Sequence, residues 1–230
     1  MSKNLVIISS AICTINKPLN YTPIRSFFTH EQRYEQTLQT IESIKQMIPD
    51  SYIVITEGTE IQKEMEKTIL EKVDYYYNVS KLEWVSQCVN GPAKGYGEIA
   101  SILAYLKSAH YEENKANFKS MSKISGRYRL RSDFKFDVLE DRIICKMEFN
   151  NRHHSSGIWM STMFYTISKL LFSEYIKSLE ECFNNEEAIN GIAIEHILPL
   201  CMFKNNIKVA NKTPLLVEGE YGPWGGYVYH

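Results

Sequence analysis

The strongest constraint on the fold is an apolar run, a helix pattern and a second apolar run in close succession near the start of the chain. Residues 5–8 are apolar and mostly β-branched, which is typical of a strand covered on both faces of a parallel sheet. Thr29 and Gln32 have capping-box spacing, and apolar residues then recur at helical spacing until Pro49. Residues 51–56 repeat the strand pattern. This order predicts a βαβ unit with parallel strands.

Strand and helix patterns continue to alternate along the rest of the chain. The expected strands are 73–77, 118–124 and 143–147, and the expected helices are 61–72, a helix beginning at 94, 166–182 and 192–198. Residues 14–27, 112–117 and the glycine-rich tail have the composition of loops. We therefore expect an α/β fold in a single domain, with a mostly parallel twisted central sheet flanked by helices.

Charge and cysteine content narrow the class of protein. The 26 basic and 27 acidic residues leave a net charge of −1, which provides no overall attraction to nucleic acid. The five cysteines are scattered without metal-binding spacing, as expected of reduced thiols. The first apolar run is too short to span a bilayer. These features predict a soluble cytoplasmic protein with no nucleic-acid partner and no membrane span.

Residues 123–128 place two cations, a hydroxyl and a glycine together. The guanidinium of Arg127 suits phosphate oxygens, and Gly126 lets backbone N–H groups approach the same anion. Lys123 adds an ammonium and Ser125 a hydroxyl. The segment predicts a site for a phosphate-bearing ligand, and the alternative is a basic turn that pairs with acidic surface groups.

A second phosphate motif lies at the expected start of a helix. Lys94, Gly95 and Gly97 there combine an ammonium with exposed backbone N–H groups, which suits a pyrophosphate. The spacing is neither that of the dinucleotide fingerprint nor that of a P-loop. A tight turn without a ligand is the alternative.

The loop after the first strand carries a third set of candidates. Ligands of open α/β sheets bind beyond the carboxyl ends of the strands. Ser10 and Thr14 leave room there for a flat base or a ribose, and Arg25 adds a cation. An ordinary polar loop is the alternative.

In this order, the motifs resemble small GT-A-fold glycosyltransferase-like proteins found among bacterial and giant-virus sugar-assembly genes. The similarity extends from residue 5 to about residue 226. It implies a GT-A-like single domain. Residues about 1–130 would form a Rossmann-like nucleotide-binding half that binds a UDP- or GDP-linked sugar, and residues about 131–230 would bind a glycan or lipid-linked acceptor. The implied activity is sugar transfer in polysaccharide biosynthesis, with inversion favoured. The alternatives are a non-catalytic nucleotide- or carbohydrate-binding protein on the same fold and a nucleotidyltransferase.

The sequence departs from the better-known pattern of that family. Many GT-A enzymes hold a divalent cation with an Asp-x-Asp motif after the fourth strand, where this chain would have Ser-Gly-Arg-Tyr. Fixed cations would then have to neutralise the diphosphate. The candidates are Lys94, Lys123, Arg127 and Arg25. We therefore predict no metal site, and Mg²⁺ or Mn²⁺ held by Asp133 or Asp137 is the less favoured alternative.

The resemblance also indicates candidates for the base and the acceptor site. Glu195 and His196 stand where many inverting GT-A enzymes place an acidic pair beside the acceptor, and either side chain is a chemically reasonable base. His154 and Trp159, in one polar cluster, and Trp224, in the tail, are candidates for acceptor binding because aromatic rings pack on sugars. A surface loop and a flexible terminus are the respective alternatives.

Overall fold

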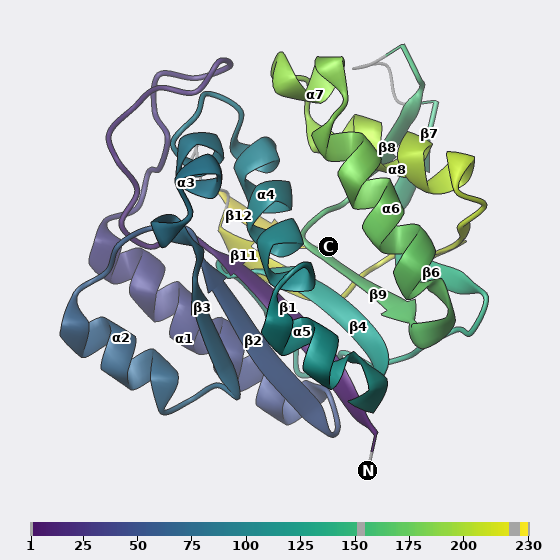
Figure 1. Cartoon of the computed structure of the whole chain (residues 1–230), viewed down its shortest axis with the longest axis horizontal. Helices are drawn as coiled ribbons and strands as arrows, with labels where there is room; N and C mark the ends of the chain where they lie inside the picture. The colour runs from purple at the N-terminus through teal and green to yellow at the C-terminus, as the bar shows by residue number, and fades with distance from the viewer. Residues whose placement is uncertain (1, 151–154, 221–225, 230) are drawn as a thin grey trace.

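The structure is a computed structural model of the chain that describes residues 2–150, 155–220 and 226–229. A seven-stranded sheet forms its centre, in the order β10-β6-β9-β4-β1-β2-β3 (Figure 1). The strands are β1 (Lys3–Ser10), β2 (Ser51–Glu57), β3 (Tyr75–Asn78), β4 (Phe118–Ser125), β6 (Arg142–Cys145), β9 (Phe164–Ser168) and β10 (Lys208–Asn211).

Most strands of this sheet are parallel to their neighbours. β1 pairs with β2 and β4, β2 pairs with β3, and β6 pairs with β10, all in parallel. Only β9 is antiparallel, to both β4 and β6, within the described residues. The predicted α/β class with a mostly parallel central sheet is confirmed.

Helices cover both faces of the sheet, because alternate residues of β1 point to opposite sides. Val6 and Ile8 pack with α1 and α2 on one face, whereas Leu5 and Ile7 pack with α4, α6 and α8 on the other. The helices are α1 (His30–Met47), α2 (Lys63–Leu70), α3 (Glu83–Val89), α4 (Lys94–Leu106), α5 (Ala109–Asn114), α6 (Phe172–Phe183), α7 (Glu186–Ile189) and α8 (Ile194–Lys204). Short 3-10 helices cover Val79–Lys81, Lys115–Asn117 and Lys169–Leu171.

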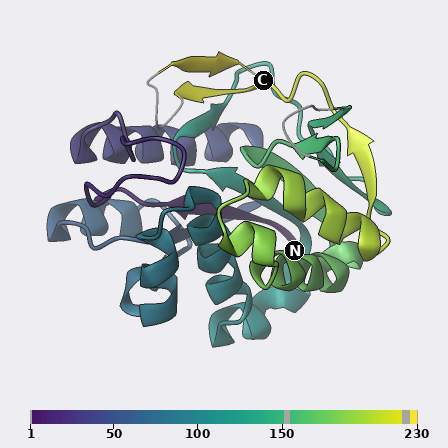
Figure 2. The ribbon, with the colours of Figure 1, turned by 90° about the horizontal axis from the view of Figure 1, so that it is seen from above.

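Two smaller sheets stand beside the central one. β5 (Tyr128–Leu130) continues the chain after β4 and pairs with β11 (Val217–Glu220), which pairs in turn with β12 (Tyr227–Tyr229). Figure 2 shows this small sheet along one side of the molecule, near α1. β7 (Met147–Phe149) and β8 (Ile158–Met160) form a separate hairpin-like pair.

The capping box at the start of α1 is confirmed. The Thr29 side chain accepts a hydrogen bond from the Gln32 backbone, and the Gln32 side chain accepts one from the Thr29 backbone. Both groups satisfy donors that the first turn of a helix leaves unpaired. Among the described residues, no helix is both long and apolar enough to cross a membrane.

Three expectations for secondary structure are wrong. The helix expected at 166–182 begins only at Phe172, because residues 164–168 are buried on both faces and complete the central sheet as β9. The expected loop at 112–117 is helical, through α5 and a 3-10 turn. Much of the tail forms strands, because β11 finds a partner in β5 that lies far away in the sequence.

Candidate functional site

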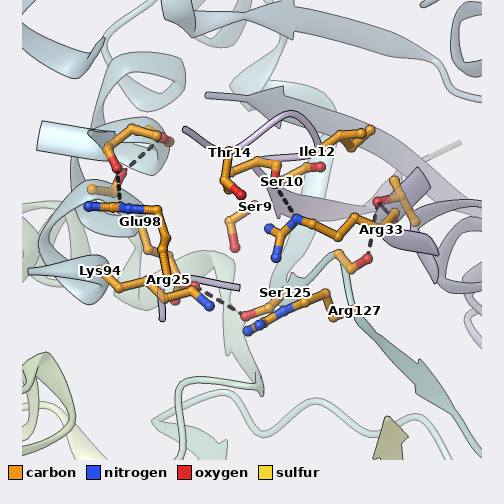
Figure 3. A pocket seen from close by; sticks show the side chains of 16 residues that line it. Ser9, Ser10, Ile12, Thr14, Arg25, Arg33, Lys94, Glu98, Ser125 and Arg127 are labelled. Carbon is orange, nitrogen blue, oxygen red and sulfur yellow. Dashed lines mark hydrogen bonds between the residues drawn. The ribbon is translucent and has the colours of Figure 1, made fainter. Parts of the chain in front are cut away.

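A cavity opens where β1 and β4 end, between the first turns of α1 and α4 (Figure 3). The carboxyl ends of neighbouring parallel strands meet at this edge of the sheet, as expected for a ligand site of this fold class. The predicted donor-site residues that line the cavity are Ser10, Thr14, Arg25, Lys94, Gly97, Ser125, Gly126 and Arg127. The structure therefore brings three motifs together that are separated by up to about half of the chain.

The cavity contains cationic groups that lack partners. The Nζ atom of Lys94 and the Nη1 atom of Arg127 are buried and have no hydrogen-bond partner within the described part of the chain. Burial, and next the positive charges of Arg127 and Arg33, hold the pKa of Lys94 well below its ordinary value. Buried donors without acceptors are rare in proteins, so these two atoms indicate a missing anion.

Arg33 is a cavity residue that the sequence reasoning missed. It lies in α1 with 4% of its surface exposed, and its Nε donates to the backbone oxygen of Ala11 at 2.7 Å. Burial and the charge of Arg127 lower the pKa of Arg33 to about 9. A signal was present, because Arg33, Thr37 and Thr40 continue the buried face of the helix with polar residues, which is unusual for a face that packs on a sheet.

Arg25 lines the cavity but uses its guanidinium mainly for structure. Nε donates to the backbone oxygen of Lys17 at 3.0 Å, and Nη1 donates to that of Val89 at 2.8 Å. Nη2 donates to the backbone oxygens of Asn90 and Gly91 at the end of α3. Arg25 therefore holds the loop after β1 against α3, and most of its donors are already satisfied.

Lys123 lies outside the cavity lining, unlike the other cations of the prediction. Its Nζ forms an ion pair with Glu98 and donates to Ser125 Oγ at 2.8 Å and to the backbone oxygen of Thr162. Only 1% of its surface is exposed, and burial lowers its pKa. The ammonium has three protein acceptors, so it neutralises Glu98 at the cavity wall and is not placed to contact an anion directly.

The glycines of the second motif allow close packing of helices. A Cβ at Gly95 would lie 2.7 Å from a side-chain carbon of Ile194, and a Cβ at Gly97 would lie 2.6 Å from the Cα of Val89. Gly95 does not line the cavity, whereas Gly97 does. Both glycines thus let α3 and α8 approach the first turn of α4, which positions Lys94.

Glu195 and His196 lie in the first turn of α8, next to the Lys123 ion pair. Thr162 Oγ1 donates to Glu195 Oε1 at 3.0 Å, and the backbone oxygen of the same Thr162 accepts from Lys123. Burial, and next the charge of Glu98, raise the pKa of Glu195. His196 is buried, and its Nδ1 lies 2.7 Å from the backbone oxygen of Ile158. Neither residue lines the cavity.

The predicted acceptor residues are not brought to the cavity in the described structure. Trp159 is half-buried on β8, opposite Glu148 of β7, and is not among the cavity residues. His154 and Trp224 lie outside the described residues. Their roles stay predictions.

The groups around the cavity do not fit a divalent cation. Within the described ranges, no cluster of three or more histidine, cysteine, aspartate or glutamate side chains has metal-binding geometry. Glu98 is the acidic residue of the cavity lining, and it is already paired with Lys123. Asp133 lies elsewhere, in a bidentate pair with Arg131, and Asp137 accepts from the backbone of Val138.

Comparison with known proteins shows a distant similarity of fold. No family model and no curated protein matches the sequence. Among solved structures, the apo form of the glycosyltransferase GlyE of Streptococcus pneumoniae TIGR4 is similar, with a TM-score of 0.47 and 10% identity. The match covers 92% of this chain and 45% of that chain, so this protein spans less than half the length of GlyE.

Proposed function

We propose that the protein transfers a sugar from a nucleotide-diphosphate donor to a glycan or lipid-linked acceptor, and that the cavity beyond β1 and β4 holds the diphosphate. The observation that carries the proposal is the pair of buried donors on Lys94 and Arg127, which have no acceptor among the residues that the structure describes. Cationic groups taken out of water are costly unless an anion joins them. A diphosphate would supply both the charge and the acceptor oxygens.

Transfer would proceed without a metal ion in this proposal. Arg33 and Arg127 provide positive charge where a leaving diphosphate develops negative charge, which is the role that a divalent cation has in other enzymes. Lys94 adds to this charge once the bound diphosphate favours its protonated form. The same excess of cations repels Mg²⁺ or Mn²⁺. A chelator should therefore leave the activity unchanged.

Glu195 is the proposed base in a transfer with inversion. It would take the proton of the acceptor hydroxyl while the hydroxyl oxygen attacks the anomeric carbon and the bond from that carbon to the diphosphate breaks. The raised pKa of Glu195 suits this role at neutral pH, and Thr162 orients one of its oxygens. The Nδ1 atom of His196 faces a backbone oxygen and therefore carries the proton, so a basic role of this residue would fall to Nε2 and His196 stays the alternative base.

Isothermal titration calorimetry with UDP and GDP tests the proposal. We expect at least one of them to bind and Arg127→Ala to weaken that binding by about tenfold or more, because a hydrogen bond to a charged group is lost. Arg131→Ala is the matched control, since Arg131 is half-buried and paired with Asp133 away from the cavity. Binding of neither nucleotide by the unaltered protein would contradict the proposal. Binding of UDP- or GDP-sugars without any transfer would favour the non-catalytic alternative.

A further inference from the structure

A polar groove lies on the other side of α1 from the central sheet. Its walls are the exposed face of α1 and the small sheet of β5, β11 and β12, which stand near each other in Figure 2. Its lining includes Gln36, Gln39, Arg127, Glu218, Glu220 and Tyr227. Arg127 lines both this groove and the cation cavity, so the two sites are adjacent.

The side-chain amide of Gln36 leaves an acceptor unused in the groove. Its Nε2 donates to Glu220 Oε2 at 2.6 Å, and a carboxylate can only accept, so this contact sets which end of the amide is the nitrogen. The Oε1 atom is consequently directed elsewhere, is buried and has no hydrogen-bond partner among the residues that the structure describes. A hydroxyl donor of a ligand would satisfy it.

The charge of the groove differs from that of the cavity. Two guanidinium groups, of Arg127 and Arg129, face three carboxylates, of Glu35, Glu218 and Glu220. Arg129 Nε is paired with Glu218 at 2.7 Å. Positive and negative groups nearly balance, so the groove offers no excess charge to a phosphate and suits a neutral polar ligand.

We propose that this groove binds a neutral saccharide chain. Sugar hydroxyls both donate and accept hydrogen bonds, which matches a surface of amides, carboxylates and guanidinium groups. The ring of Tyr227, with 47% of the residue exposed, provides an apolar face for a pyranose. Arg127 lines both the groove and the cavity, so a chain bound in the groove lies beside the proposed diphosphate site. That the chain is a part of the acceptor remote from the reacting hydroxyl rests on the proposed function, whereas the binding itself does not.

Binding to an array of neutral oligosaccharides, with no nucleotide present, tests the groove. We expect the unaltered protein to bind at least one of them, and Gln36→Ala to weaken that binding by about tenfold because a ligand hydroxyl loses its acceptor. Gln46→Ala is the matched control, since Gln46 is exposed on the same helix outside the groove. Binding to no oligosaccharide, or equal binding by Gln36→Ala and Gln46→Ala, would overturn the proposal.

Two further measurements keep the outcome unambiguous. Gln39→Ala removes a second amide at an exposed position, so it should fold normally and weaken the same binding by a smaller factor. Calorimetry with UDP and GDP on Gln36→Ala should match the unaltered protein, because Gln36 does not line the cavity. If the unaltered protein binds a saccharide but no nucleotide, the proposed function is contradicted and the saccharide site in the groove is supported. If it binds a nucleotide but no saccharide, only the saccharide site in the groove is contradicted.

Discussion

Two groups of buried charges lie side by side at the same edge of the sheet, and they differ in whether their charges are matched. Lys123 is surrounded by acceptors, with Glu98 as its ion-pair partner and Glu195 close by through Thr162. The donors of Lys94 and Arg127 face the cavity without acceptors among the described residues. A buried charge that has an oppositely charged partner in the protein is stabilised by that partner, whereas a buried charge without one indicates a ligand. Burial alone therefore does not separate structural cations from binding cations.

The largest effect is expected on turnover, from a change of Glu195 beside the Lys123–Glu98 pair. Glu195→Gln should lower turnover by about a hundredfold or more, because general base catalysis is lost, with little change in nucleotide affinity. Burial raises the pKa of Glu195, and a base must be unprotonated, so turnover of the unaltered protein should fall as the pH drops through a pKa above that of an exposed glutamate. Steady-state rates against pH measure both effects. Unchanged turnover in Glu195→Gln would remove this residue as the base.

Lys123→Met tests whether Lys123 is structural. Removing one partner of a buried ion pair leaves Glu98 uncompensated, so the free energy of unfolding should fall by about 3–5 kcal/mol. Urea denaturation measures the change. The double variant with Glu98→Leu should recover part of the loss, because both charges are then absent. A variant as stable as the parent would show that the pair contributes nothing.

Lys94→Met should change the free energy of unfolding of the ligand-free protein in the opposite direction to Lys123→Met. The buried amine has no acceptor in the described part of the chain, so a methionine of similar length should raise the free energy of unfolding by about 1–3 kcal/mol while weakening UDP or GDP binding. The pKa of Lys94 is lowered in the folded state, so the unfolded chain binds more protons and stability rises with pH below the ordinary lysine value. Denaturation at several pH values should show that this slope is smaller in the variant. A destabilised variant would place Lys94 with the structural cations.

The smallest effect is expected at Asp133. Its pair with Arg131 is exposed, so Asp133→Ala should change the free energy of unfolding by less than about 1 kcal/mol and leave transfer activity unaltered. Activity assays with and without EDTA accompany the denaturation curves. Loss of activity in this variant together with sensitivity to EDTA would support a metal site at Asp133. It would also weaken the contrast between the paired charge of Lys123 and the unpaired donors that face the cavity.

Local patterns predicted the beginning of the fold well. The first strand, the capping box of α1 and the start of α4 at Lys94 depend on short stretches of neighbouring residues, and the structure has all three. The helix expected at 166–182 failed over its first part because β9 is hydrogen-bonded on its two edges to β4 and β6, which are distant in sequence. An apolar run of that length fits either a strand or a helix until its partners are known.

In the candidate site, too, the sequence predicted some features and missed others. Residue types identified Lys94, Arg127 and Lys123 as cations suited to phosphate, and the rule for strand ends indicated where such a ligand would bind. The sequence by itself determined the α/β class and these chemical groups, because they depend on local periodicity and side-chain type. Only the tertiary structure decided that Lys123 is paired with Glu98, that Arg33 joins the cavity and that Arg127 also faces a groove. Those outcomes depend on which distant groups share a buried volume, and no short stretch of sequence contains that information.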